Sequence, residues 1–181
     1  MKRLIILLCL SLLLSGCGAS APAPATASDP TAIPTEAPAE KPYDGFVFST
    51  TDRDGNPWDE SAFAGHALTM LNFWEPWCGP CVGEMPDLQR LQDAYADRGF
   101  QILGVYSTPG MESDVQTVLD KTGVTYPILH YTDVFDRFQS GYVPTTVFID
   151  AEGLVIGEGD EALYIGSNSY DGWAAIIEGL L

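Results

Sequence analysis

The 181-residue sequence is poor in basic side chains and in histidine. It has eight Lys and Arg residues against 25 Asp and Glu, which gives a formal net charge of −17 at pH 7, and its two histidines are His66 and His130. The sequence contains no cluster of Lys and Arg, which argues against nucleic acid as a partner. The acidic excess is typical of a solvated surface and does not by itself indicate a substrate.

Histidine and cysteine are also too few, and too far apart, for the common metal and haem sites. A structural zinc ion needs four ligands, but two of the four cysteines, Cys9 and Cys17, lie near the N-terminus. A c-type haem site needs a histidine directly after the second cysteine of its pair, and here that residue is Val82. We therefore expect no cofactor and no metal site.

The N-terminal region lacks an apolar run long enough to cross a bilayer comfortably as a helix. A basic start at residues 1–3 precedes a short apolar run at 4–14, and this order predicts a secretory signal peptide over residues 1–16. The run ends in Leu14-Ser15-Gly16-Cys17, which resembles the bacterial lipobox. This resemblance implies cleavage before Cys17, lipid attachment to its sulfur, and a location on the outer face of a bacterial cell membrane. The alternative is a spare cysteine in an uncleaved helix.

Residues 18–42 are rich in Ala, Pro, Ser and Thr and contain almost no aliphatic side chains. Such a segment buries too little apolar surface to offset the entropy lost on ordering, and its Ala-Pro steps favour an extended chain. We interpret residues 17–42 as a lipidated cysteine followed by a disordered tether. Residues 43–181 are long enough for one domain with a single sizeable core.

The remaining cysteines lie in Trp77-Cys78-Gly79-Pro80-Cys81, between the apolar run 67–74 and a helical pattern. The first turn of a helix has unpaired N–H groups and the positive end of the helix dipole, which lower the pKa of a thiol there. Pro80 suits an early helical position, because its missing N–H would have no partner. We expect Cys78 to be the exposed nucleophile and Cys81 the buried resolving thiol. An inert structural disulfide is the alternative.

Strands and helices alternate along residues 43–181, which indicates an α/β fold around a mixed sheet. The expected strands are 46–49, 68–74, 101–106 and 127–130, with a hairpin made by 145–150 and 154–157. The expected helices are 81–98, 114–122 and 170–181, and glycines 99 and 123 should end the first two. The run 68–74 is almost continuously apolar, as in a central strand buried on both faces.

These motifs resemble the thioredoxin superfamily. The pentapeptide 77–81 matches its active-site sequence, and Leu71-Asn72-Phe73-Trp74 and Glu84-Met85-Pro86 are similar to the TlpA/ResA-type branch of extracytoplasmic thioredoxin-like proteins. The resemblance implies a thioredoxin fold: a central mixed β-sheet flanked by helices, with an N-terminal β extension and a central α/β insertion.

A second match to this family is Val143-Pro144, at the start of the apolar run 143–150. The resemblance implies a cis bond before Pro144, which faces the dithiol, and an extended substrate segment that pairs with the Val143 backbone. The alternative is an ordinary proline at a strand edge.

Four residues around the dithiol are further candidates. Trp77 is expected to offer an apolar contact surface beside Cys78, or else to be a core tryptophan. Asn72 stands where thioredoxins have a buried aspartate that helps to move protons, and an amide cannot titrate. Glu75 and Glu84 are therefore possible pKa modulators. Glu84 either reaches the dithiol or is a solvated charge at the helix start. Glu75 either opposes the Cys78 thiolate and favours reduction or points into solvent without influence.

The pattern predicts an extracytoplasmic, membrane-anchored thiol–disulfide oxidoreductase. Reduction is the expected direction, because Gly-Pro between the cysteines resembles thioredoxin. The resemblance implies protein disulfide or dithiol substrates and an integral-membrane thiol electron donor, and we expect a monomer. One alternative is a peroxiredoxin-type thiol peroxidase, although the threonine that peroxiredoxins place three residues before their cysteine is Glu75 here. The other is a copper-handling module that uses Cys78 and Cys81 as soft ligands.

Overall fold

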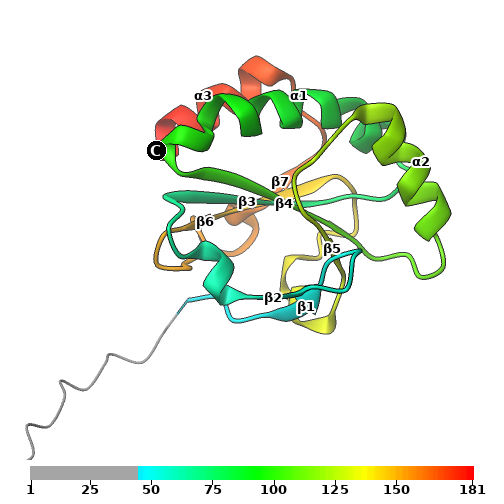
Figure 1. Ribbon diagram of the computed structural model, residues 1–181. Helices are drawn as coiled ribbons and strands as arrows, with labels where there is room; N and C mark the ends of the chain where they lie inside the picture. Colours follow the sequence, from blue (N-terminus) through cyan, green and yellow to red (C-terminus); the bar gives the residue numbers. More distant parts are fainter. Residues whose placement is uncertain (1–44) are drawn as a thin grey trace, which may run out of the picture. The chain divides into compact units, whose positions relative to one another are not determined.

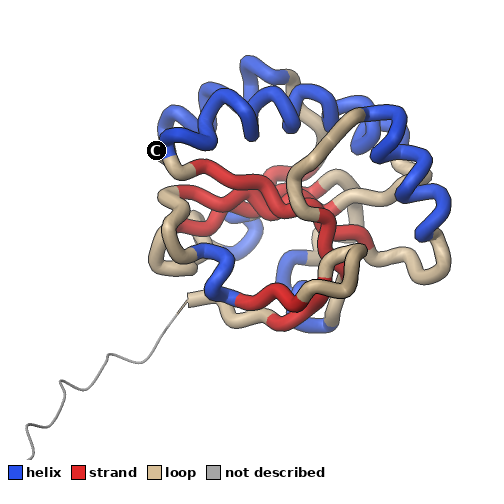
Figure 2. The backbone as a smooth tube through the Cα atoms, viewed as in Figure 1, coloured by secondary structure: helices blue, strands red, loops and turns tan. Residues whose placement is uncertain are grey.

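A computed structural model describes residues 45–181, so the predicted signal peptide, the predicted lipidation site Cys17 and the tether lie outside the described residues. The described part is built around a five-stranded sheet with the strand order β5-β4-β3-β6-β7. In Figure 1 the helices α1, α2 and α3 cover one face of this sheet, and the two-stranded sheet β1-β2 lies on the other side. Figure 2 shows the same layers coloured by secondary structure.

The five-stranded sheet is mixed, as the sequence predicts. Its strands are β3 (Leu68–Phe73), β4 (Phe100–Tyr106), β5 (Ile128–His130), β6 (Thr145–Asp150) and β7 (Tyr164–Ile165). β4 runs parallel to β3 and to β5, whereas β6 runs antiparallel to β3 and to β7. The small antiparallel sheet joins β1 (Ser49–Thr51) and β2 (Pro57–Asp59).

The helices on the covered face are α1 (Gly79–Tyr95), α2 (Glu112–Thr122) and α3 (Tyr170–Leu180). Helix α1 contacts both of the others. Short 3-10 helices complete the fold: η1 (Glu60–Phe63), η2 (Ala96–Arg98), η3 (Asp133–Phe138) and η4 (Gly159–Ala162). Gly99 and Gly123 follow η2 and α2 in the left-handed conformation, with φ of 84° and 71°, as expected for helix-ending glycines.

Strand β3 is the central strand predicted from its apolar run, and all six of its residues are buried. Because side chains alternate across a strand, Leu68 and Met70 join the core beneath the helices, whereas Leu71 and Phe73 join the core on the opposite face. The second core is rich in aromatic rings from segments far apart in the sequence: Phe46, Phe48, Phe63, Phe73, Phe135 and Phe138. The active-site loop therefore leaves a strand that is fixed from both sides.

Two expected strands are wrong. The first strand is β1, not 46–49, and Phe46 and Phe48 instead insert their rings into the second core. Residues 154–157 make an isolated bridge between Val155 and Ile149 and no strand. The chain then turns away at Gly157, whose φ is 98°. The outer partner of β6 is β7, which is too short for a periodic pattern to reveal.

Candidate active site

The two cysteines of the C-G-P-C sequence lie at the start of α1, directly after the loop that leaves β3. They form a disulfide with a Cα–Cα distance of 5.3 Å. Cys78 is the N-cap of the helix, and its Sγ accepts a hydrogen bond of 3.2 Å from the Cys81 amide. The helix begins two residues earlier than expected, so Cys78 rather than a later residue caps it. The sulfur thus occupies the position where backbone N–H groups and the helix dipole favour negative charge.

The Val143–Pro144 peptide bond is cis, and it precedes β6 beside the active-site loop. The Val143 carbonyl oxygen lies 3.6 Å from Cys78 Sγ. β6 runs antiparallel to β3, and this arrangement brings the start of β6 to the end of β3 from which the active-site loop emerges. The prediction of a cis bond beside Cys78 is therefore confirmed.

The surroundings of the disulfide differ strongly in exposure. Cys78 is 5% exposed and Cys81 is 1% exposed, so the predicted order holds, although both sulfurs are covered in the disulfide form. Trp77 is 64% exposed and Tyr142 is 71% exposed. Trp77 is thus a surface side chain and not a core residue. Two uncovered aromatic rings come from the two segments that meet at Cys78.

The Glu84 carboxylate is buried in the fold and is held by other side chains and by the backbone. Its Oε1 accepts from Asn72 Nδ2 at 3.3 Å, and its Oε2 accepts from the Asn168 amide at 3.0 Å and from Trp173 Nε1 at 3.2 Å. Burial raises the pKa of Glu84, and these three hydrogen bonds partly offset the rise. Glu84 follows Cys81 by three residues on α1, so the two side chains share one face of the helix.

The interpretation of Glu84 as a solvated helix-end charge is therefore wrong. Sequence reasoning also missed two of its partners, Asn168 and Trp173, which come from the start of α3 and the loop before it. Trp173 was expected only as part of the apolar side of that helix. A buried indole N–H usually has an acceptor, although that of Trp74 has none among residues 45–181. For Trp173 this rule is the one signal that could have pointed to an acidic partner.

Tyr126 is a further residue near this carboxylate that the sequence did not indicate. Its ring is buried in the core beneath the helices. Its hydroxyl group has no hydrogen-bond partner within residues 45–181. Burial, and then the charge of Glu84, raise the pKa of Tyr126 well above its ordinary value, so the phenol stays neutral.

Glu75 is also buried, with 3% of its surface exposed, so the alternative in which its side chain points into solvent is wrong. Its Oε1 accepts a hydrogen bond of 2.9 Å from the Ser107 amide and a second one from the Ser107 hydroxyl. Its Oε2 is buried without a partner among the described residues. Glu75 lines a cavity of about 30 Å³ together with Tyr142 and Val143.

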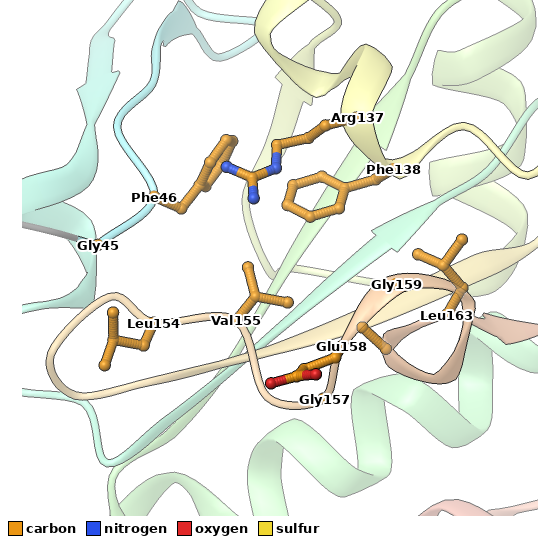
Figure 3. A pocket seen from close by; sticks show the side chains of 11 residues that line it. Gly45, Phe46, Arg137, Phe138, Leu154, Val155, Gly157, Glu158, Gly159 and Leu163 are labelled. Carbon is orange, nitrogen blue, oxygen red and sulfur yellow. The ribbon is translucent and has the colours of Figure 1, made fainter.

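A groove of about 580 Å³ is lined by Trp77, by the start of α1 and by helix α2. Another hollow of about 510 Å³ lies away from the dithiol and is lined by neither cysteine. Figure 3 shows this second hollow, in which the Arg137 side chain lies beside the rings of Phe46 and Phe138. The guanidinium carbon is 5.6 Å and 5.3 Å from the centres of those two rings. This hollow therefore borders the second core and not the dithiol.

Neither a membrane span nor a metal site is found among residues 45–181. No helix in this range has the length and apolar character needed to cross a membrane. No three or more His, Cys, Asp or Glu side chains in the same range are grouped so that they could hold a metal ion.

Comparison with known proteins gives the family. The model of the AhpC/TSA family matches residues 44–157. The chain belongs to the AhpC/TSA family. The predicted resemblance to the TlpA/ResA-type branch of the thioredoxin superfamily is confirmed by the relatives described next, and the thioredoxin fold is confirmed by solved structures.

Among curated relatives of this AhpC/TSA protein are two that are named thiol-disulfide oxidoreductase ResA. The one from Oceanobacillus iheyensis is 41% identical over 88 residues, which is 48% of this chain and 45% of that protein. The one from Geobacillus kaustophilus is 34% identical over 110 residues, which is 60% of this chain and 62% of that protein. The matched part thus spans about half to three fifths of these relatives.

Solved structures with the same fold cover most of the described chain. A thiol:disulfide interchange protein of the thioredoxin family from Chlorobium tepidum has a TM-score of 0.63 at 27% identity and covers 75% of this chain and 94% of its own. A secreted Mycobacterium tuberculosis disulfide oxidoreductase has a TM-score of 0.59 at 22% identity and covers 73% and 95%. The second likeness concerns the fold alone.

Proposed function

We propose that this protein is a thiol–disulfide oxidoreductase in which Cys78 attacks and Cys81 resolves. The observation that carries this proposal is the position of Cys78. Its sulfur caps α1, accepts the Cys81 amide at 3.2 Å and lies 3.6 Å from the Val143 carbonyl. One sulfur thus has both a stabilised negative charge and a neighbouring backbone segment against which a substrate can align. The names of the ResA relatives agree with this chemistry.

The reaction follows from the two thiols of the reduced form. The Cys78 thiolate attacks one sulfur of a substrate disulfide, a Cys78–substrate disulfide forms, and the other substrate sulfur leaves as a thiolate that takes a proton. Cys81, as a thiolate, then attacks Cys78 Sγ and releases the second substrate thiol. The protein ends as the Cys78–Cys81 disulfide, and two electrons have passed to the substrate. The reverse sequence oxidises a dithiol.

Substrate binding is assigned to the surface that surrounds Cys78. The exposed ring of Trp77 offers an apolar contact next to the sulfur. The Val143 backbone, before Pro144, would pair with an extended segment of the substrate in the manner of an added strand. The exposed ring of Tyr142 adjoins this backbone and would cover one side of that segment.

Glu84 is the proposed acid–base partner of Cys81. Asn72, which binds the Glu84 carboxylate, cannot itself titrate. A buried carboxyl group with a raised pKa can accept the Cys81 proton when the mixed disulfide has to be resolved. It can return this proton when the disulfide of the protein is reduced again.

The proposed cellular role is reduction of exported proteins outside the cytosol. We infer lipid attachment at Cys17, a tether over residues 17–42, a domain over residues 43–181, and electrons supplied by an integral-membrane thiol protein. Substrates would be apocytochrome c thiols, methionine sulfoxide reductases or other exported proteins. A Cys17→Ala variant should lose membrane attachment in cell fractionation, and full retention in the membrane fraction would contradict the anchor.

A trapping experiment tests the chemistry. Cys81→Ser should accumulate mixed disulfides through Cys78, whereas Cys78→Ser should form none and should lose reduction of an insulin or glutathione disulfide. Mass spectrometry of the trapped adducts identifies both the cysteine and the substrates. Adducts on Cys81 in the Cys78→Ser variant, at the wild-type rate, would reverse the assignment.

The alternatives give different results in the same preparation. If the protein were a thiol peroxidase, its Cys81→Ser variant would react with hydrogen peroxide as fast as the wild type reacts with a disulfide. A copper-handling module would bind Cu(I) tightly through the reduced dithiol and would exchange poorly with glutathione. We expect slow peroxide consumption and weak copper binding.

A further inference from the structure

Glu75 is a buried carboxylate that the proposed exchange reaction does not use. One of its oxygens accepts two donors from Ser107, and the other oxygen has no partner among residues 45–181. An unpaired buried acceptor destabilises the folded state, so stability alone does not explain this residue. The structure thus holds a carboxylate in a covered place.

Two independent observations place Glu75 near Cys78. The Cys78 amide donates to the Glu75 carbonyl at 3.0 Å, so the two residues are the ends of one tight turn. Glu75 and Val143 line the same cavity of about 30 Å³. The carbonyl of that same Val143 lies 3.6 Å from Cys78 Sγ. Glu75 therefore lines a cavity whose wall includes the residue that contacts Cys78 Sγ.

No cation forms an ion pair with Glu75 in the described part of the chain, and Lys121 lines the groove that Pro76 and Trp77 also line. The ion pairs among residues 45–181 are Arg90–Asp87 and Arg98–Glu178. Arg53 donates to Gln116 and to a backbone carbonyl of α2, and Arg137 lies over aromatic rings. The cavity beside Glu75 is small, at about 30 Å³.

We propose that Glu75 is a redox-tuning residue, whose charge opposes the Cys78 thiolate and makes the protein a stronger reductant. The inference rests on the proposed exchange chemistry at Cys78. A like charge nearby in a medium of low dielectric constant disfavours the thiolate, whereas the disulfide carries no charge and is unaffected. The reduced form is therefore less stable than the helix N-terminus alone would make it. A less stable reduced form gives up its two electrons more readily.

The equilibrium that reports this effect is exchange with glutathione. Two glutathione thiols reduce the Cys78–Cys81 disulfide, and the products are the protein dithiol and one glutathione disulfide. Two electrons pass to the protein, and the two thiol protons pass to the cysteines or, where Cys78 is ionised, one of them passes to solvent. The Glu75 charge acts only on the ionised dithiol, so its effect must grow as the pH rises through the Cys78 pKa.

Other titratable groups near Glu75 are the same in wild type and in Glu75→Gln. Tyr131 lines the same cavity, and burial and its hydrogen bond to Asp136 raise its pKa to about 12, so it stays neutral between pH 6 and 9. On the far side of Ser107, a neighbouring pocket is lined by His130 and Glu112. Further charged and titratable neighbours are Tyr142 in the cavity, Glu84 on the Cys81 side and Lys121 in the groove beside Trp77. Comparison of variants at the same pH cancels these contributions.

The test is the glutathione equilibrium constant of Glu75→Gln and wild type between pH 6 and 9 at low salt. A glutamine side chain is nearly isosteric with glutamate and keeps a carbonyl oxygen for Ser107, so the substitution removes mainly the charge. We expect Glu75→Gln to favour the reduced form by about two- to fivefold at pH 9, and by progressively less as the pH falls. Alkylation with iodoacetamide should show a lower Cys78 pKa in the variant. The control Glu152→Gln removes the same charge from an exposed turn and should match wild type.

The outcomes separate this inference from the proposed function. A gap that is the same at every pH, or no gap at all, in a variant with normal exchange activity would overturn the role of Glu75 and leave the oxidoreductase intact. Absence of glutathione exchange in the wild type would contradict the oxidoreductase itself. Equal thermal stability of wild type and Glu75→Gln, both in the disulfide form, would show that both proteins are folded.

Discussion

The two sides of the Cys78–Cys81 disulfide each contain one buried carboxylate, and the protein holds the two in different ways. On the Cys81 side, Glu84 accepts hydrogen bonds from β3, from α3 and from the loop before α3. On the Cys78 side, Glu75 accepts from Ser107 alone and keeps one oxygen unpaired among the residues that the structure describes. The first carboxylate is enclosed by three segments of the fold, whereas the second lies beneath exposed aromatic rings.

This difference separates two electrostatic roles that the sequence alone does not separate. A carboxyl group with a raised pKa beside the resolving thiol can exchange a proton with it. A carboxylate near the attacking sulfur is proposed to act on it through its charge. We therefore expect Glu84→Gln to change the rate of resolution, and Glu75→Gln to change the redox equilibrium.

The largest expected effect is on the rate at which Cys81 resolves a mixed disulfide. Glu84→Gln should slow this step by about tenfold to a hundredfold, because the substitution removes the proton acceptor. The measurement is stopped-flow release of the second thionitrobenzoate after reduced protein reacts with Ellman's reagent. Glu75→Gln serves as the matched control and should leave this rate within about twofold. Equal slowing in both variants would remove the distinction between the two sides.

A smaller effect is expected on the free energy of unfolding. Trp173→Phe removes the indole donor of Glu84 and leaves a buried charge with one partner fewer, which should cost about 1–3 kcal/mol. Urea unfolding of the disulfide form measures it. The control is Trp77→Phe, since that indole is exposed and its Nε1 lies 3.5 Å from Thr108 Oγ1, and it should change stability by less than about 0.5 kcal/mol. Similar losses in both variants would mean that ring packing, and not the hydrogen bond, dominates.

A comparable loss, somewhat smaller, should follow from Ser107→Ala on the Cys78 side. The substitution removes the hydroxyl donor of Glu75 but leaves the amide donor, so about 1–1.5 kcal/mol of stability should be lost. Ser167→Ala, at an exposed position before α3, is the control and should be close to neutral. The loss should shrink when Ser107→Ala is combined with Glu75→Gln, because the donor then serves no charge. An undiminished loss in the double variant would contradict the contact.

The smallest effect concerns the pH dependence of folding. Burial raises the pKa of Glu84 in the folded state, so the folded protein binds more protons than the unfolded chain between the unfolded pKa and the raised folded pKa. The contribution of Glu84 to stability is therefore most favourable below the unfolded value of about 4.5 and declines as the pH rises through the folded pKa. Glu84→Gln should flatten this part of the stability–pH curve relative to wild type. An unchanged curve in Glu84→Gln would show that the carboxyl group titrates normally.

Most of the fold and the dithiol could be predicted because local rules determine them. The apolar run of β3, the glycines that end η2 and α2, and Pro80 in the first turn of α1 are recognisable over a few residues. Two motifs in the right order, the C-G-P-C sequence and Val143-Pro144, carried the family resemblance. That resemblance was enough to predict the fold and a cis proline beside Cys78. The start of α1 differed because a cysteine side chain can itself act as the helix cap.

Tertiary structure alone decided which donors the carboxylates near the dithiol meet. Glu75 meets a serine 32 residues away, and Glu84 meets donors 84 and 89 residues away. Which segments become neighbours depends on the order of strands in the sheet, and no spacing within one segment encodes that order. The same holds for β7, a two-residue strand whose pairing with β6 replaced the expected hairpin. The sequence determined where the sulfurs are and what they can do, whereas their electrostatic surroundings arise only when distant segments exclude water together.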